Sequence, residues 1–199
     1  MMISMTAAAL LIAGVLASCP LRVANHGGED RSWLSAAVVG SQLLPASLQQ
    51  SAEPVLGFQN GQPQPLLIVD LPSSTAAAPI RVEVHTALAF SRMEAAARRF
   101  GLSLQVNSGF RTQEQQQEVF ALYRKGRGPL AARPGFSNHQ SGHALDLDMQ
   151  SPRVRSWLFR NAHRYGFQRT VPSERWHGEF RGDLRKLLGQ PDPLQPRNS

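Results

Sequence analysis

The sequence contains little cysteine, few aromatic residues and a deficit of acidic charge, and each shortage excludes a class of protein. Cys19 is the only cysteine among 199 residues, so no disulfide can form within the chain. Aromatic residues make up 7% of the chain, and no basic stretch carries the interleaved aromatics expected of a nucleic-acid-binding surface. Asp and Glu number 14 against 21 Lys and Arg, and the net charge of +7 favours an anionic partner or surface.

Long apolar runs are also scarce, and the one that exists lies at the N-terminus. Residues 7–17 are too short to span a bilayer comfortably but are typical of the core of a secretory signal. Residues 1–6 lack the Lys or Arg that such a signal usually carries. The run ends in Leu16-Ala17-Ser18-Cys19, which resembles the bacterial lipobox, where cleavage precedes a cysteine that receives lipid.

We therefore expect residues 1–18 to be a signal peptide of the lipoprotein type and Cys19 to be the lipidation site. The protein would then be exported and held in the bacterial cell envelope as a membrane-anchored lipoprotein. Soluble export after cleavage is one alternative, and an uncleaved anchor or a misassigned start is the other.

Composition also predicts the domain organisation. Residues 19–64 contain scattered Gln, Ser, Pro and Gly without a sustained apolar period, so we expect a largely irregular tether. A hydrophobic content of 42% in 199 residues suffices for one core, and we expect the folded domain over residues 65–187. Residues 188–199 would form a C-terminal tail.

Helical and strand patterns interleave within the expected domain. They predict helices over residues 84–100, from a Thr112 cap to about 125, and 152–165, and strands over residues 66–69, 102–106, 143–149, 167–171 and 176–180. The last two strands are close enough to pair as a hairpin. We therefore expect an α+β fold, with a small, mainly antiparallel sheet and helices packed around it.

Two short stretches, residues 137–146 and 174–177, contain the residue types of a catalytic zinc site. Such a site holds the metal with three protein groups and keeps a fourth position for water. His139 and Asp146 are seven residues apart, so on one continuous strand they would face opposite sides. We therefore expect His139 in the preceding loop, where Gly142 lets the backbone turn so that both side chains converge.

The third ligand would be His177, and Glu174 would lie beside the metal without binding it. A carboxylate in that position can take a proton from water, which is the role of a general base. A closed structural zinc site would usually need a fourth ligand, and Cys19 is far from the motif in sequence. His143 is expected to be structural, and Asp148 either supports a ligating histidine or ends a strand in solvent.

The pattern Ser-x-His-x-x-Gly-x-Ala-x-Asp, followed by Glu-x-Trp-His, resembles the zinc site of the VanY-type D-alanyl-D-alanine carboxypeptidases. These enzymes belong to a wider group that includes the lysostaphin-type peptidases, VanX dipeptidases, phage L-alanyl-D-glutamate endopeptidases and the hedgehog domain. Residues 108–112, 132–135 and 157–167 also fit the family, so the resemblance spans roughly residues 80–182 in order.

The resemblance implies a hedgehog-like fold with the zinc site in a cleft on the sheet. The residues it implies are His139, Asp146 and His177 as ligands of one Zn²⁺, Glu174 as general base, Arg111 as oxyanion stabiliser, and Ser137 and Gln116 as substrate-binding residues. Arg175 stands where the family leads us to expect proline, and Gly178 where an aromatic residue is common. The rim after His177 is therefore expected to differ.

The leading hypothesis is a monomeric zinc carboxypeptidase that removes the terminal D-alanine from peptidoglycan stem peptides. The chain offers no convincing Ser-x-x-Lys nucleophile motif, which favours the metal route. An L-alanyl-D-glutamate endopeptidase or an L,D-carboxypeptidase is the enzymatic alternative, and the loop over residues 126–138 decides between them. A non-catalytic zinc module that binds cell wall or protein is the alternative of another class, which the presence of Glu174 disfavours. The stem peptide and, through the lipid anchor, the membrane are the expected partners, with no nucleic acid.

Overall fold

Seven strands, three α-helices and one 3₁₀ helix make up the described part of the chain. The computed structural model describes residues 51–71, 79–183, 186, 189 and 192–194. The elements are β1 (Glu53–Gln59), β2 (Gln62–Leu71), β3 (Ile80–Glu83), α3 (Val84–Arg98), β4 (Val106–Ser108), α4 (Gln113–Arg124), β5 (Ala144–Leu147), α5 (Pro152–Asn161), η1 (Ala162–Tyr165), β6 (Phe167–Gln168) and β7 (His177–Phe180). The predicted signal peptide and Cys19 lie outside the described residues.

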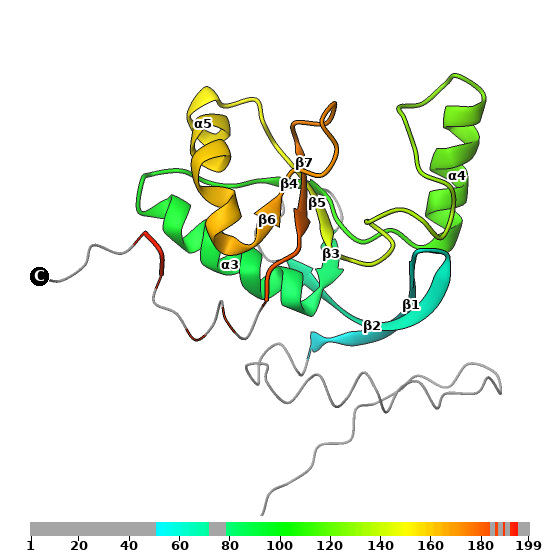
Figure 1. Ribbon diagram of the computed structural model, residues 1–199, viewed down its shortest axis with the longest axis horizontal. Coiled ribbons are helices and arrows are strands. Elements are labelled where there is room, and N and C mark those ends of the chain that lie inside the picture. The colour runs from blue at the N-terminus through cyan, green and yellow to red at the C-terminus, as the bar shows by residue number, and fades with distance from the viewer. Residues whose placement is uncertain (1–50, 72–78, 184–185, 187–188, 190–191, 195–199) are drawn as a thin grey trace, which may run out of the picture.

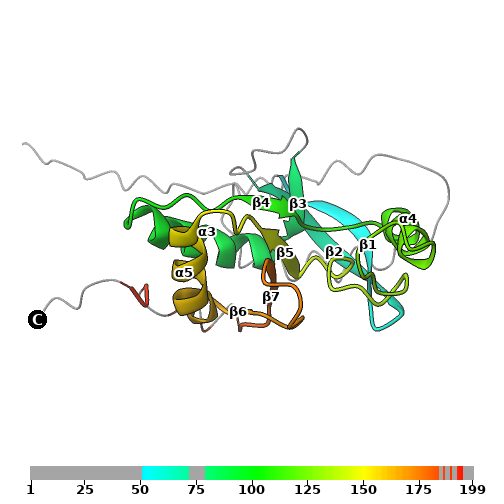
Figure 2. The same cartoon turned by 90° about the horizontal axis from the view of Figure 1, so that it is seen from above.

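The strands form two antiparallel sheets, one in the order β1-β2-β3 and the other in the order β4-β5-β7-β6. In both views α3 and α5 lie together at one end of the molecule and α4 stands at the other end, with the β1–β2 hairpin on the side of α4 (Figure 1, Figure 2). The predicted α+β class with an antiparallel sheet is confirmed.

The domain boundary expected at residue 65 is wrong, because residues 53–64 are not part of an irregular tether. They form β1 and the start of β2, which pair from Glu53 opposite Ile68 to Gln59 opposite Gln62. Asn60 and Gly61 make the turn with φ of 52° and 79°. Two positive φ values in a two-residue loop are typical of the hairpin turn that Asn-Gly sequences favour.

The second sheet has one apolar face and one polar face, as the alternation over residues 143–149 predicts. Asp146 lies directly opposite His177, and Ala144 lies opposite Glu179, so these four residues share one face. Leu145 and Leu147 point the other way and are buried in the core. The polar face is therefore the one that can carry a site.

α3 and α5 pack on the apolar face, and α4 and α5 begin where their caps predict. Ser151 accepts from the backbone N–H of Val154, with Pro152 in the first turn, and Thr112 closes a capping box with Gln115. The third predicted helix changes to 3₁₀ geometry at η1 and stops at Gly166, which has φ of 84°. In the core, the rings of Trp157 and Tyr165 stack with their centroids 6.4 Å apart.

The strand predicted over residues 102–106 begins later than expected, because β4 covers only Val106–Ser108. Leu102, Leu104 and Val106 are all buried, so the alternation records which side chains face the core. Strand pairing starts only at Val106, opposite Leu147. Alternating burial thus extends beyond the hydrogen-bonded ladder.

None of the helices in the described residues has both the length and the apolar character needed to cross a membrane.

Candidate metal centre

His139 lies in a tight turn that only glycine could close. The backbone N–H of Gly142 donates to the carbonyl of His139 at 3.2 Å, and the turn packs against Glu83. Gly142 has φ of 70°, and a Cβ there would lie 2.9 Å from the backbone nitrogen of Glu83. This is why the motif needs glycine three residues after the histidine.

The ring of His139 is oriented by a backbone carbonyl. Its Nδ1 lies 2.7 Å from the carbonyl oxygen of Gly109, which can only accept, so Nδ1 carries the proton in the neutral ring. Its Nε2 is then left with a lone pair and lies 3.4 Å from Asp146 Oδ2. A carbonyl that fixes the tautomer of a histidine in this way is a regular feature of metal sites.

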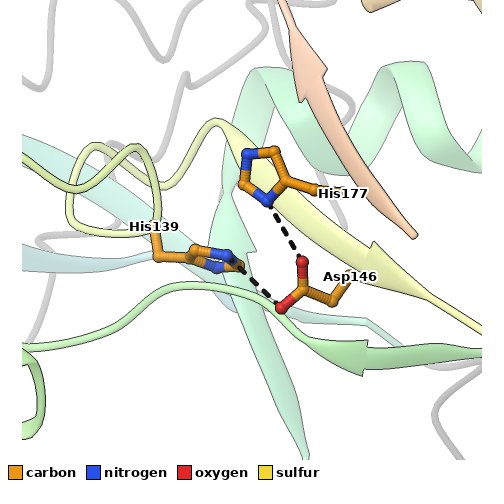
Figure 3. Close-up of side chains that lie close together, drawn as sticks. All are labelled: His139, Asp146 and His177. Atoms are coloured by element: carbon orange, nitrogen blue, oxygen red, sulfur yellow. Dashed lines mark hydrogen bonds and ion pairs between the residues drawn. The ribbon is translucent and has the colours of Figure 1, made fainter. Parts of the chain in front are cut away.

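Asp146 connects the two histidines (Figure 3). His177 Nδ1 lies 3.1 Å from Asp146 Oδ1, and the ring centroids of His139 and His177 are 5.2 Å apart. One ligand-type atom from each of the three residues lies within 4.8 Å of the others, and both histidines are buried. The expected set of three thus comes together from the loop, from β5 and from β7.

The donor atoms are close enough together to hold one metal ion. Asp146 Oδ2 lies 3.4 Å from His139 Nε2 and Asp146 Oδ1 lies 3.1 Å from His177 Nδ1, and one ligand-type atom from each residue lies within 4.8 Å of the others. Two imidazole nitrogens and one carboxylate oxygen are also a donor set of catalytic zinc sites, which keep the fourth position open.

The electrostatics of the cluster favour an ionised carboxylate. Burial opposes the charge on Asp146, but the contacts with His139 and His177 outweigh it and hold the pKa of Asp146 well below its usual range. Asp146 is therefore anionic near neutral pH. An ionised carboxylate is the form that binds metal.

Glu174 lies at the edge of the cluster. Its Oε2 is 4.0 Å from His177 Nδ1, and its side chain is 22% exposed, so the carboxylate can meet both the cluster and solvent. A turn fixes this position, because the backbone N–H of His177 donates to the carbonyl of Glu174 at 3.2 Å. Glu174 is close enough to serve a reaction at the cluster and is not one of the three clustered residues.

Arg111 faces the same site and is held by Gln116. The backbone N–H of Arg111 donates to the carbonyl of His139 at 3.1 Å, and its Nη1 donates to Gln116 Oε1 at 2.8 Å. Burial lowers the pKa of Arg111, whereas the charges of Asp146 and Glu174 act to raise it, so both carboxylates lie within electrostatic reach of the guanidinium.

Gln116 and Ser137 both make contacts within the protein. Gln116 is fully buried, and its Nε2 donates to the carbonyl of Ala132 at 2.8 Å, so both ends of the amide are occupied. Ser137 is also buried, and its Oγ accepts from the backbone N–H of His139 at 3.4 Å. Their role in substrate binding stays a prediction.

Gln140 is a supporting residue that the sequence analysis missed. It is fully buried, its Oε1 accepts from the backbone N–H of Gly135 at 2.6 Å, and its Nε2 donates to Gln113 at the start of α4 at 2.6 Å. It thereby ties the loop that carries His139 to a helix. The available signal in the sequence was the amide side chain of Gln140, directly after the expected ligand His139.

Arg175 and Gly178, the two residues that depart from the family pattern, line a hollow of about 320 Å³ between α5, η1 and β7. Gly178 leaves this space open, because a Cβ there would have its nearest neighbours at 3.9 Å. Arg175 and the exposed Trp176 also line this hollow, and the guanidinium of Arg169 lies 4.7 Å from the centre of the Phe159 ring. The space next to His177 is thus lined by apolar side chains together with two arginines.

An antiparallel sheet that carries a His-Asp-His cluster beside a further glutamate is the architecture of a metallopeptidase domain. A family model described as VanY, D-alanyl-D-alanine carboxypeptidase, matches residues 79–183, which is more than half of the chain. The chain belongs to this family. The matched range agrees with the span of residues 80–182 predicted from the motifs.

Known proteins similar to this chain include one curated relative and several solved structures. A D-alanyl-D-alanine carboxypeptidase from Enterococcus faecalis is 26% identical over 192 residues, which cover 81% of this chain and 63% of that relative's length. The structure of VanYB in complex with D-alanine-D-alanine is 27% identical and covers 57% of this chain and 78% of that one, with a TM-score of 0.47. The vancomycin resistance D,D-pentapeptidase VanY in complex with Zn(II) is 24% identical and covers 68% and 93%, with a TM-score of 0.46.

Proposed function

We propose that this protein is a zinc-dependent carboxypeptidase that removes the terminal D-alanine from peptidoglycan stem peptides. The observation that carries the proposal is the convergence of His139, Asp146 and His177 in a chain that belongs to the VanY family. The free carboxylate of Glu174 beside them favours an enzyme over a binding module, since binding alone needs no base.

In this proposal His139 Nε2, Asp146 and His177 Nδ1 hold the zinc. A zinc ion bound there supplies Lewis acidity, which lowers the pKa of water and polarises a carbonyl. Glu174 accepts a proton from the attacking water and returns it to the leaving amine. Arg111, fixed by Gln116, faces the negative charge that develops on the carbonyl oxygen, and its half-buried position strengthens that interaction.

Mass spectrometry of defined muropeptides tests the reaction. The zinc-loaded chain is incubated with stem peptides that end in D-Ala-D-Ala or in a single D-Ala, with and without a chelator. Loss of one alanine from the first substrate identifies a D,D-carboxypeptidase, loss from the second an L,D-carboxypeptidase, and internal cleavage an endopeptidase. Glu174→Gln should abolish the product, whereas Glu118→Gln, which changes an exposed glutamate on α4, should not.

No product from a folded, zinc-loaded protein would overturn the enzyme proposal. The non-catalytic binding module would then be the next hypothesis, and retention on purified cell wall would test it.

We further propose that the protein acts at the cell envelope, as the family's cell-wall substrates suggest, and that Cys19 carries its lipid anchor. Residues 1–18 would be removed and the segment before β1 would act as a tether. Metabolic labelling with a lipid analogue should mark the wild type and not Cys19→Ala. Labelling that persists in the variant would contradict the anchor.

A further inference from the structure

A second hollow, of about 550 Å³, lies beside the metal cluster and is lined mainly by polar groups. Its walls come from the hairpin tip, the start of α3, the His139 loop and the end of β7, and comprise Gln59, Asn60, His85, Asn138, His143, Glu179, Phe180, Arg181 and Gly182. Asn138 directly precedes His139. Glu179 lies two residues beyond His177 on the same face of the sheet, which places it about 7 Å along the strand.

One wall of this hollow belongs to a part of the chain outside the family match. Gln59 and Asn60 are in the β1–β2 hairpin, whereas the match begins at residue 79. The hairpin is fixed against the loop by two backbone hydrogen bonds, from Phe58 to the carbonyl of Gln140 at 3.0 Å and from Gly61 to that of Gly135 at 2.8 Å. The hollow is therefore built by the β1–β2 hairpin together with the part of the chain that matches the family model.

The lining contains one carboxylate and one guanidinium close together. Glu179 is buried, with 8% of its side chain exposed, while Arg181 is half exposed. Arg181 Nη2 lies 3.0 Å from Glu179 Oε2, in an ion pair that is not aligned as a hydrogen bond. The lining also contains the amide side chains of Gln59, Asn60 and Asn138. A ligand group with both an ammonium and a carboxylate would meet a complementary charge at each end.

We propose that this hollow binds the end of a long amino-acid side chain that carries both an ammonium and a carboxylate. The inference rests on the proposed function and names the substrate more closely. Among stem peptides, the residue that precedes D-Ala-D-Ala carries such a group when it is meso-diaminopimelate and only an ammonium when it is L-lysine. Glu179 meets the ammonium and Arg181 meets the carboxylate, so the protein selects diaminopimelate-type peptides.

Binding of two tripeptides tests this selection without relying on catalysis. The zinc-loaded full chain is titrated in a calorimeter with L-Ala-γ-D-Glu-meso-diaminopimelate and with the matching L-lysine peptide. The first should bind about tenfold more tightly, as one additional charge-assisted hydrogen bond implies. Arg181→Gln should weaken only the first peptide, so that the ratio falls toward one, and Glu179→Gln should weaken both.

Arg164→Gln is the matched control, because Arg164 is an exposed arginine on η1 and does not line the hollow. Arg181 is half exposed, so its variant should fold, and the thermal unfolding of the buried Glu179→Gln must be compared with wild type. Equal affinities for the two peptides, no binding of either, or an unchanged ratio in Arg181→Gln would overturn the inference.

The outcome separates this inference from the proposed function. If the protein trims muropeptides but binds the two tripeptides equally, the carboxypeptidase proposal stands and the selective hollow is refuted. If it binds the tripeptides selectively but trims no muropeptide, the selective hollow stands and the carboxypeptidase proposal is refuted.

Discussion

At the scale of single residues, each member of the cluster depends on a different kind of support. His139 is oriented by the carbonyl of Gly109, whereas Asp146 and His177 are placed opposite each other by strand pairing. The carboxylate contacts both rings, through Oδ2 to His139 and through Oδ1 to His177, so its charge faces both histidines. Asp146 is therefore the residue whose charge the centre needs most.

Asp146→Asn should lower zinc affinity by more than about 100-fold, because it keeps the shape of the side chain and removes the anionic ligand. Competition with a chromophoric chelator measures the affinity. Asp148→Asn is the control, since Asp148 Oδ1 accepts from the backbone N–H of Gln150 and is not one of the clustered residues. Wild-type affinity in Asp146→Asn would show that the metal binds elsewhere.

His85 gives the protein a pH-dependent contribution to stability. Its Nδ1 lies 2.6 Å from Glu83 Oε1, and this hydrogen bond raises the pKa of His85 above 6.5, although burial opposes the shift. A raised pKa means that the folded state favours the charged imidazole. The contribution is therefore complete below pH 6.5 and is lost as the pH rises through the raised pKa.

The difference in unfolding free energy between wild type and His85→Gln should accordingly be larger near pH 6 than near pH 8. The first pH lies about half a unit below the unperturbed pKa of histidine, and the second lies well above it. Urea unfolding at both pH values measures the difference. A difference that stays constant, or that grows with pH, would contradict the assigned ion pair with Glu83.

At the scale of elements, the β1–β2 hairpin supports the loop that carries His139. Gly57 allows the close approach, because a Cβ there would lie 2.6 Å from the carbonyl oxygen of Gln140 and closer still to the side chain of Leu66. Since Leu66 could turn aside but the backbone of Gln140 could not without moving the loop, a side chain at Gly57 would act directly on the ligand turn.

Gly57→Ala should therefore destabilise the fold by about 1–3 kcal/mol and also weaken zinc binding, because the displaced loop moves His139. The comparison is Gly126→Ala, where φ is 65° and no atom lies within 4 Å of the added Cβ. That variant carries a backbone penalty of about 1–2 kcal/mol and should leave zinc affinity unchanged. Equal zinc affinities in the two variants would show that the hairpin does not influence zinc binding.

The elements that the sequence predicted are those with a local signal. Thr112 and Ser151 marked helix starts, and the alternation around Asp146 identified the polar face of β5. The hairpin was missed although Asn60-Gly61 is a strong turn signal, because the scattered Gln, Ser, Pro and Gly around it show no sustained apolar period. Pro63 and Pro65 are tolerated since β2 pairs with β3 only from Ile68 onward.

The supporting contacts could not be predicted, because each joins segments that are distant in sequence. Gln140 bonds to Gln113 on α4, and the carbonyl of Gly109 fixes the ring of His139. The motifs identify which residues converge, because residue type and spacing along the sequence indicate the expected ligands. Which neighbours hold them depends on packing between α4, β4 and the loop, and no local pattern encodes it.

At the scale of the whole molecule, the metal centre joins the His139 loop to two paired strands of the second sheet. His139 comes from the loop under the hairpin, Asp146 from the centre of the second sheet, and His177 from β7. A metal bound to all three would connect the hairpin side of the molecule to the side covered by α3 and α5 (Figure 1). Metal binding should then stabilise the folded chain as a unit.

Zinc at about 1,000 times its dissociation constant should stabilise the wild type by about 4 kcal/mol, because it binds the folded state in preference to the unfolded state. For a chain of this size that corresponds to a rise in melting temperature of about 8–16 °C, which a chelator should reverse. Differential scanning calorimetry with and without zinc measures the shift. Asp146→Asn, with its affinity lowered at least about 100-fold, should keep at most about a third of the stabilisation, while Glu174→Gln should keep all of it, because Glu174 is proposed as a base and not as a ligand. A full shift in Asp146→Asn would mean that zinc stabilises the protein from another site, and a lost shift in Glu174→Gln would make Glu174 a ligand instead of a base.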